Sequence, residues 1–371
     1  MKYRRKRSWL YSSWTMNNSG NRGLYIHVPF CVRKCPYCDF YSLPGETALY
    51  SGYAQAVKRN LSYYSERFDT VYFGGGTPNL IAPYMAEILS AADIAPGAEI
   101  TAECNPASAT AETLAEMRAA GINRLSVGVQ SLHDAELKKL GRLHNAAEAE
   151  ALILAAEKAG FSSISADVML GVPGQTAESL SDTLQRLGKL PIQHISAYML
   201  TIEPATPFGK NHPLDMADDE KMADLYALCQ KLCEELGFHQ YEISNFAREG
   251  FRCRHNLKYW RDEEYLGIGP AAHSFYEEKR FAVPKDLPGF INAPRQTTEI
   301  TDDSPGDYDE RVMMGLRLAE GIPEELYKPL LPGLKLLPQE YWALENGRLR
   351  LTAAGFPVYN YIVSLLLAHT E

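Results

Sequence analysis

Short runs of apolar and β-branched residues recur through the first half of the chain, separated by longer segments with helical spacing. The runs are LYIHVPF (24–30), TVYFGG (70–75), EITAEC (99–104), RLSVGVQ (124–130), SISADVML (163–170) and HISAYMLT (194–201). Their length and composition are typical of buried strands, and the alternation of strand with helix predicts βα units in a parallel sheet of an α/β protein. Six units predict a partial barrel or an open doubly wound sheet, and both folds place their chemistry at the carboxyl ends of the strands.

The segments between the runs carry recognisable helix ends. NAAEAEALILAAEKAG has Asn145 as its N-cap candidate and Gly160 just past its end, and AEMRAAG stops on Gly121. Asparagine offers a side-chain acceptor to the first free N–H groups, and glycine tolerates the left-handed conformation that often ends a helix. The last long helix of this region is predicted over 217–238.

The pattern changes after residue 238. Residues 239–300 show few clear elements and many aromatic side chains, and the Pro- and Gly-rich stretch 284–294 is interpreted as a linker. DYDERVMMGLRLAEG (307–321) is helical and ends on Gly321, and the end of the chain then predicts a short hairpin and a helix. This order favours a small winged-helix-like C-terminal domain.

We therefore expect four regions along the chain. They are an N-terminal extension (1–20), a barrel (21–238), a connecting region (239–300) and a C-terminal winged-helix-like domain (301–371). The extension is basic and Ser-rich, contains no acidic residue and lacks the apolar core of a secretory signal. We expect it to be disordered, either as a basic tail or as a segment upstream of an alternative start at Met16. A mitochondrial transit peptide also fits the composition, but its apolar face would be short.

Composition and charge narrow the class of partner. The 371 residues are 46% hydrophobic and 22% charged, which suffices for a large core with an appended domain. The net charge is -9 and no long basic tract lies outside the first residues, so nucleic acid is not an expected partner. The C-terminal domain is instead expected to pack against the barrel or to act as a lid. No apolar run reaches the roughly 18 residues that a membrane-spanning helix needs.

Three of the seven cysteines form the motif C-x3-C-x2-C directly after the first apolar run, as Cys31, Cys35 and Cys38. An odd number of cysteines in a long chain favours a reducing compartment, here the cytoplasm, and a metal site. Structural zinc sites use four ligands, and two-cluster ferredoxins use a different spacing. Three thiolates on a short loop suit a [4Fe–4S] cluster with one iron left open for a substrate or cofactor.

This motif and the Gly-rich end of the next strand resemble the radical S-adenosylmethionine (SAM) enzymes, over roughly residues 22–290. The resemblance implies that the amino and carboxylate groups of SAM chelate the open iron. An electron from the cluster then cleaves SAM to methionine and a 5′-deoxyadenosyl radical. It also implies an electron donor such as a flavodoxin or a ferredoxin.

A closer resemblance is to the oxygen-independent coproporphyrinogen III oxidase group, through YIHVPFC, FGGGTP, the Gln of VGVQS and DVMLGVPGQT. It implies a partial (β/α)6 TIM-like barrel and nine SAM contacts. These are Tyr25, Tyr37, Gly75, Gly76, Thr77, Glu103, Gln130, Arg142 and Asp167. Each residue has an alternative role: the glycines as a tight turn, Glu103 and Asp167 as helix caps, and Arg142 as a surface charge.

Two departures separate the chain from the oxidases of this group. The oxidases carry a fourth cysteine two residues after the third, where this chain has Phe40, and they have a longer N-terminal arm. Both departures point to the oxidase-like HemW-type subgroup, regarded as haem chaperones that deliver haem to respiratory enzymes.

The segment HNLKYW resembles an HNxxYW segment linked to haem binding in that subgroup. It nominates His255, Asn256 and Tyr259 as haem contacts, because imidazole and tyrosinate both ligate haem iron. The alternative is a segment packed on the barrel, with His255 and Asn256 bonded to the backbone. Cys253 is expected to be a buried structural thiol.

Three functions compete at this point. The favoured one is a haem chaperone that binds haem as cargo, a [4Fe–4S] cluster and SAM, with haem-accepting proteins as partners and SAM cleavage left open. A transient, membrane-associated acceptor is compatible with it. The alternatives are a coproporphyrinogen III oxidase and a cluster-binding scaffold without radical chemistry.

Overall fold

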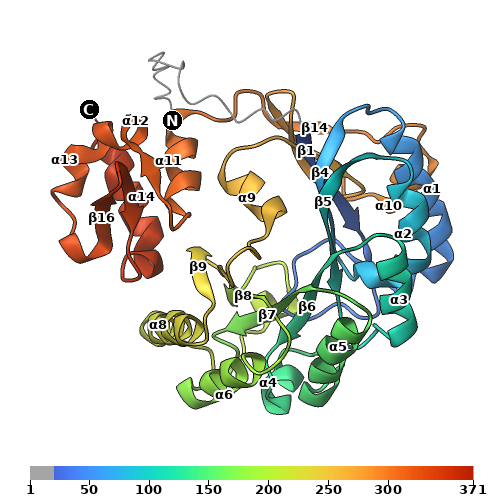
Figure 1. The fold of residues 1–371 in the computed structure, drawn as a ribbon, viewed down its shortest axis with the longest axis horizontal. Coiled ribbons are helices and arrows are strands. Elements are labelled where there is room, and N and C mark those ends of the chain that lie inside the picture. Colours follow the sequence, from blue (N-terminus) through green and yellow to red (C-terminus); the bar gives the residue numbers. More distant parts are fainter. Residues whose placement is uncertain (1–20, 371) are drawn as a thin grey trace.

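The computed structural model describes residues 21–370, and its main body is a curved twelve-stranded sheet with helices on its convex face (Figure 1). Six consecutive parallel strands form the centre of the sheet. They are β1 (Asn21–Val28), β4 (Arg67–Gly75), β5 (Asp93–Cys104), β6 (Arg124–Gln130), β7 (Ser163–Leu170) and β8 (His194–Met199). Each coincides with one of the six apolar runs, so the predicted partial barrel is confirmed. The predicted extension 1–20 lies outside the described residues.

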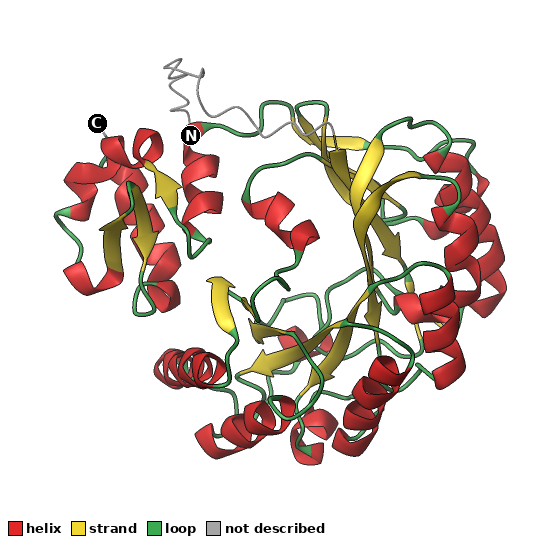
Figure 2. Ribbon diagram, in the orientation of Figure 1, coloured by secondary structure: helices red, strands yellow, loops and turns green. Residues whose placement is uncertain are grey.

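The connecting helices cover the convex face of the sheet (Figure 2). They are α1 (Tyr50–Leu61), α2 (Ala82–Leu89), α3 (Ala111–Ala119), α4 (Asp134–Lys139), α5 (Ala146–Lys158), α6 (Ala177–Leu187) and α8 (Asp219–Glu235). Asn145 caps α5: its Oδ1 accepts from the Glu148 N–H at 2.9 Å. Gly121 and Gly160 have φ of 102° and 88° just past α3 and α5, as predicted.

The alternation of side chains along each strand gives the sheet two different faces. Along β4, Val71 and Phe73 are fully buried in the apolar core beneath the helices. Thr70 and Tyr72, on the opposite face, bond to polar groups on the concave side. The concave side of the partial barrel is therefore polar. Within residues 21–370, no helix is long and apolar enough to cross a membrane.

The expectation of few elements in residues 239–300 is wrong, because this region extends the sheet at both edges. Its strands are β9 (His239–Glu242), β10 (Asn245–Ala247), β11 (Tyr265–Ile268), β12 (His273–Tyr276) and β13 (Lys279–Ala282), and β14 (Glu299–Asp302) spans its end. β11 pairs parallel to β1, whereas β10 pairs antiparallel to β8, so β9 and β14 are the two edges. These strands have three or four residues each, too few for a clear sequence period.

The stretch interpreted as a linker instead contains helix α10 (Leu287–Asn292). The Asp286 carboxylate accepts from the Gly289 N–H at 3.0 Å and caps this helix. Leu287 and Phe290 are buried, and the Phe290 ring lies 5.9 Å from that of Tyr53 on α1. Proline in the first turn is compatible with a helix start, which explains the misinterpretation.

The end of the chain forms a helical unit around a three-stranded sheet. Its elements are α11 (Tyr308–Leu316), β15 (Ile322–Pro323), α12 (Glu324–Tyr327), α13 (Leu331–Leu334), β16 (Trp342–Glu345), β17 (Arg348–Leu351) and α14 (Tyr359–Ala368). The predicted hairpin and final helix are confirmed as β16–β17 and α14, but α11 ends before Gly321. Arg317 joins this unit to the barrel: it lies 4.1 Å over the Trp260 ring and 3.7 Å from the Glu242 carboxylate.

Candidate cofactor site

The three cysteines of the motif lie on one loop at the carboxyl end of β1. All three are free and partly exposed, and the loop turns between them where the Cys38 N–H donates to the Cys35 carbonyl at 3.1 Å. Burial raises the pKa of Cys38 to about 11, and Cys35 and Cys31 add to the shift, so a bound metal would displace its proton. Among the described residues, no three His, Cys, Asp or Glu side chains converge on a single metal ion. A cluster makes no such demand, because each thiolate binds its own iron.

Hydrogen-bond donors from two other segments, one after β4 and one after α4, contact two of these thiols. The Thr77 hydroxyl donates to Cys31 Sγ at 3.4 Å, and Arg142 Nη1 donates to Cys35 Sγ at 3.8 Å. Arg142 Nη2 also donates to the Gly128 carbonyl at 2.8 Å and to Asn105 Oδ1 at 3.2 Å. Arg142 is therefore no free surface charge, and its guanidinium places positive charge beside the thiols.

Gly75 and Gly76 let the end of β4 approach the cysteine loop. The Gly76 N–H donates to the Val28 carbonyl at 2.8 Å, and the Thr77 N–H donates to the Phe30 carbonyl at 2.6 Å. A Cβ on Gly76 would lie 2.4 Å from the Phe30 oxygen, and Gly75 has φ of 106°. The glycines thus form a turn that brings Thr77 to the thiols.

Two carboxylates face the concave side near the same strand ends. Glu103 accepts from the Gly75 N–H at 3.2 Å and from the Tyr72 hydroxyl at 3.1 Å, and Asp167 accepts from the Ser126 hydroxyl at 2.9 Å. Burial raises the pKa of Glu103 to about 8, with Asp167 adding to the shift, and burial raises the pKa of Asp167 to about 6. Neither carboxylate caps a helix that follows its strand; for example, Thr110 caps α3.

The remaining three predicted contacts border this region. Tyr25 stacks on Tyr72 with ring centroids 6.3 Å apart, and its hydroxyl donates to His27 Nδ1 at 3.1 Å. Tyr37 lies on the cysteine loop among the apolar residues around Leu140. Gln130 ends β6 with φ of 66°, a left-handed conformation that is uncommon for a residue with a side chain. Of the nine predicted residues, Thr77 and Arg142 contact the thiols directly, and Glu103 reaches the same turn through the Gly75 N–H.

His255, nominated above as a haem contact, is not open to solvent in the folded barrel. His255 lies on α9 (Arg254–Trp260), between β4 and α11 in Figure 1, and is fully buried. Its Nδ1 bonds to the Thr70 hydroxyl at 2.9 Å, and its Nε2 bonds to the Tyr259 hydroxyl at 2.8 Å. Both ring nitrogens and the Tyr259 oxygen therefore already have partners. The segment is packed on the barrel, as the alternative interpretation expects, but the His255 ring bonds to side chains rather than to the backbone.

Helix α9 is fixed inside the partial barrel at both ends. The Glu99 carboxylate of β5 accepts from the backbone N–H groups of Arg254 and His255 at 3.1 and 3.0 Å. Lys258 is almost fully buried, and its Nζ lies 3.0 Å from Asp69 and 3.2 Å from Glu263. The carboxylate at the helix N-terminus stabilises this position, and the two carboxylates compensate the charge of the buried lysine.

Comparison with known proteins identifies the family. The model of the radical SAM superfamily matches residues 25–187. The "Heme chaperone HemW" of Haemophilus influenzae is 36% identical over 326 residues, 82% of this chain and 85% of that protein. That of Escherichia coli is 40% identical over 262 residues, 67% of this chain and 69% of that protein. This chain belongs to the HemW family.

Two further matches extend the family comparison. A mouse protein named "Radical S-adenosyl methionine domain-containing protein 1, mitochondrial" is 35% identical over 398 residues, 95% of this chain and 89% of that protein. The structure of the Escherichia coli coproporphyrinogen III oxidase HemN, described as a radical SAM enzyme, has a TM-score of 0.78 and covers 93% of this chain and 90% of that protein. Its sequence identity is 20%, so this likeness shows the fold.

The superfamily implies a [4Fe–4S] cluster and SAM, and the residues around the cysteine loop of this chain fit both groups. Arg142 keeps a buried Nε–H without a partner among the described residues. This donor suits the carboxylate of an amino acid moiety, and Glu103 and Asp167 supply acceptors for amino or hydroxyl groups. The three thiols supply cysteine thiolates, which are the usual protein ligands of iron–sulfur clusters.

Replacing Glu103 with glutamine should change how the stability of the cofactor-free protein depends on pH. Because the folded pKa is about 8, the folded protein holds a proton on Glu103 that the unfolded chain releases above about pH 4.3. The parent should therefore lose stability as the pH rises from about 5 to 8. In denaturant titrations, the free energy of unfolding of E103Q should rise relative to that of the parent by about 1–3 kcal/mol between pH 5 and 8. Glu116→Gln is the control, because Glu116 is exposed and its replacement should leave the pH dependence of stability unchanged. If the stability of E103Q and of the parent changed with pH in parallel, the prediction would be contradicted.

Sequence reasoning missed Tyr72, which connects α9 to the carboxylate of the site. Tyr72 donates to Glu103, and its ring stacks on His255 with centroids 5.3 Å apart. A signal was present, because Thr70, Tyr72 and Gly74 alternate with the apolar residues of their strand and so share its concave face. The alternation along the strand could not show that Tyr72 would stack on His255 of α9.

Proposed function

We propose that this protein is a haem chaperone of the radical SAM type, which binds haem and passes it to haem-requiring respiratory proteins. The observation that carries the proposal is its likeness to proteins named heme chaperone over most of both chains. The cysteine loop supports it, because Phe40 stands where the oxidases have a fourth cysteine and is 63% exposed.

In this proposal the cofactors bind at the carboxyl ends of the barrel strands. Cys31, Cys35 and Cys38 would hold the cluster, and the nine residues named above would hold SAM. When bound, the cluster and SAM supply one-electron reductive chemistry. This chain's residues would orient SAM: Arg142 would donate to its carboxylate, and Glu103 and Asp167 would accept from its amino or hydroxyl groups.

The haem site remains part of the proposal, but the expected contacts need a change of structure. His255 and Tyr259 reach a haem iron only if α9 leaves the barrel and breaks the bonds to Thr70 and Glu99. Asn256, between them, is partly exposed. We therefore place no haem ligand on α9 in its docked position.

Compartment and partners follow from the cluster. All seven cysteines are free, and a cluster needs reduced thiols, so we propose that the protein acts in the cytoplasm. Its partners are haem, haem-accepting proteins, some of them transiently at a membrane, and an electron donor such as a flavodoxin or ferredoxin.

Side-by-side incubation with haem and with coproporphyrinogen III tests the function. The anaerobically reconstituted protein should bind haem, seen as a shifted Soret band, and should form no protoporphyrinogen IX. It should cleave SAM only weakly without a partner. Turnover to protoporphyrinogen IX would establish the oxidase instead. An absence of 5′-deoxyadenosine under every reductant would favour the scaffold.

A further inference from the structure

Helix α9 lies between the barrel and the C-terminal unit (Figure 1) and contacts both. On the barrel side, His255 bonds to the Thr70 hydroxyl of β4 at 2.9 Å, and Lys258 pairs with Asp69 of the same strand at 3.0 Å. These contacts are a hydrogen bond and an ion pair, whose polar groups water can also solvate. The barrel side of α9 is therefore held mainly by polar contacts.

The other side of α9 is held by a short segment of the C-terminal unit. The Arg317 guanidinium lies 4.1 Å over the ring of Trp260, and Glu320 pairs at 3.2 Å with Arg261, the residue just past the helix. Leu318, between them in sequence, belongs to one buried apolar cluster with residues of the same helix. The docked position of α9 thus depends on the C-terminal unit as well as on the barrel.

Tyr72 connects the position of α9 to the cofactor site. Its ring stacks on that of His255, with centroids 5.3 Å apart and an angle of 28° between the ring planes. Its hydroxyl donates to Glu103 Oε1 at 3.1 Å, while Glu103 Oε2 accepts from the Gly75 N–H at 3.2 Å. Because the ring and the hydroxyl of a tyrosine move together, a shift of α9 would displace a donor that orients the Glu103 carboxylate.

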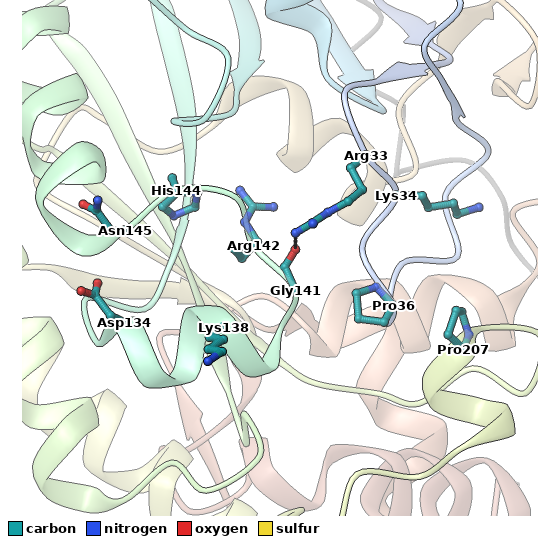
Figure 3. Close-up of a pocket in the computed structure, with 10 residues that line it drawn as sticks. All are labelled: Arg33, Lys34, Pro36, Asp134, Lys138, Gly141, Arg142, His144, Asn145 and Pro207. Atoms are coloured by element: carbon teal, nitrogen blue, oxygen red, sulfur yellow. Dashed lines mark hydrogen bonds between the residues drawn. The ribbon is translucent and has the colours of Figure 1, made fainter.

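The opposite side of the proposed SAM site is held without α9. The partners of Arg142 are Asn105, Gly128 and Cys35. Figure 3 shows Arg142 on the segment after α4, where it borders a cavity of about 570 Å³ beside the cysteine loop. The position of α9 should therefore affect the Glu103 side of the site and leave the Arg142 side in place.

We propose that α9 is a regulatory helix through which the C-terminal unit controls the affinity of this protein for SAM. Docked α9 holds Tyr72 against Glu103, which makes Tyr72 a positioning residue of the site. When the C-terminal unit releases α9, Glu103 loses this donor and SAM binds more weakly. The coupling is reciprocal, so bound SAM stabilises docked α9. The inference deepens the proposed function and rests on it, because Glu103 must contact SAM.

Arg317→Gln combined with Glu320→Gln tests the link from the C-terminal unit. Both residues contact α9 and lie outside the cofactor site, and the double variant keeps the net charge. The Kd of the reconstituted protein for radiolabelled SAM, measured by equilibrium dialysis, should rise about 5- to 50-fold. Hydrogen exchange of the backbone amides of residues 254–261 should become at least about 10-fold faster. Thermal unfolding checks that the variant is folded.

Tyr72→Phe breaks the same link at the barrel end. It keeps the ring on His255 and removes the hydroxyl that bonds Glu103. The Kd for SAM should rise about 5- to 50-fold, although α9 stays docked. In the parent, SAM should slow the exchange of the α9 amides at least about threefold, and Y72F should lose this protection. A helix with a structural role alone would exchange at the same rate with and without SAM.

The matched control is Glu345→Gln with Arg350→Gln. These residues form an ion pair of 2.8 Å on the β16–β17 hairpin of the same C-terminal unit. The control removes the same two charges and should change the Kd for SAM less than about twofold. Equal weakening by the two double variants would overturn the proposal, as would an unchanged Kd in the Arg317 and Glu320 double variant or in Y72F.

SAM binding by the parent separates this failure from failure of the proposed function. If the parent with a full cluster binds no SAM, the cofactor assignment fails and this inference fails with it. If the parent binds SAM but the Kd does not respond to the variants at either end of the link, only regulation through α9 is wrong.

Discussion

Replacing Cys35 with alanine should abolish cluster assembly while leaving the fold intact. Cys35 lies on a partly exposed loop, and its Sγ accepts from Arg142 at 3.8 Å. Truncating such a side chain should change the free energy of unfolding by about 0.5 kcal/mol. With only Cys31 and Cys38 left on the loop, two irons would lack a protein thiolate, and three-thiolate ligation fails. Reconstitution should yield close to zero iron, against about four per chain for the parent.

Iron analysis and the visible absorbance of the reconstituted protein measure this effect, and thermal unfolding reports the fold. Cys229→Ala is the matched control, because Cys229 is buried in the hydrophobic core on α8, where its Sγ lies 3.9 Å from that of Cys233. It should bind iron like the parent. Full cluster content in C35A would show that the three-cysteine assignment is wrong.

Replacing His255 with alanine should destabilise the protein by about 2–4 kcal/mol and leave its haem affinity unchanged. The imidazole is fully buried, so its removal leaves a cavity against Tyr72 and deprives the Thr70 and Tyr259 hydroxyls of their partner. Burial lowers the pKa of His255 to about 3, so the imidazole is neutral and no charge is lost. Denaturant unfolding gives the stability, and haem titration followed at the Soret band gives the affinity.

Two comparisons make the His255 result interpretable. His133→Ala removes a partly exposed imidazole and should cost under about 1 kcal/mol. Tyr259→Phe keeps the ring, removes the hydroxyl that bonds His255 Nε2, and should cost about 1 kcal/mol. If H255A kept its stability but lost the Soret shift, α9 would have to leave the barrel to bind haem, and the expected haem ligand would be restored.

The sequence by itself determined the barrel and the cysteine loop, because both depend on residues close together in the chain. A strand buried under helices must be apolar along its length, and Asn145 and Gly160 define the ends of α5 locally. The cysteine loop is eight residues long and needs no distant partner to be recognised. Short strands such as β12 and the proline-initiated helix α10 were missed, because their stability comes from neighbours that are distant in sequence.

Only the tertiary structure decided what the HNxxYW segment contacts and which residues meet the cysteine thiols. His255 and Thr70 are 185 residues apart, and Arg142 and Cys35 are 107 apart. A side chain's type states which bonds it can make, but its partner depends on which segments the curved sheet brings together. Histidine in an aromatic segment suits haem and a buried hydrogen-bond network equally well. Both ring nitrogens of His255 have partners because α9 packs against β4, and this packing exists only in the folded barrel.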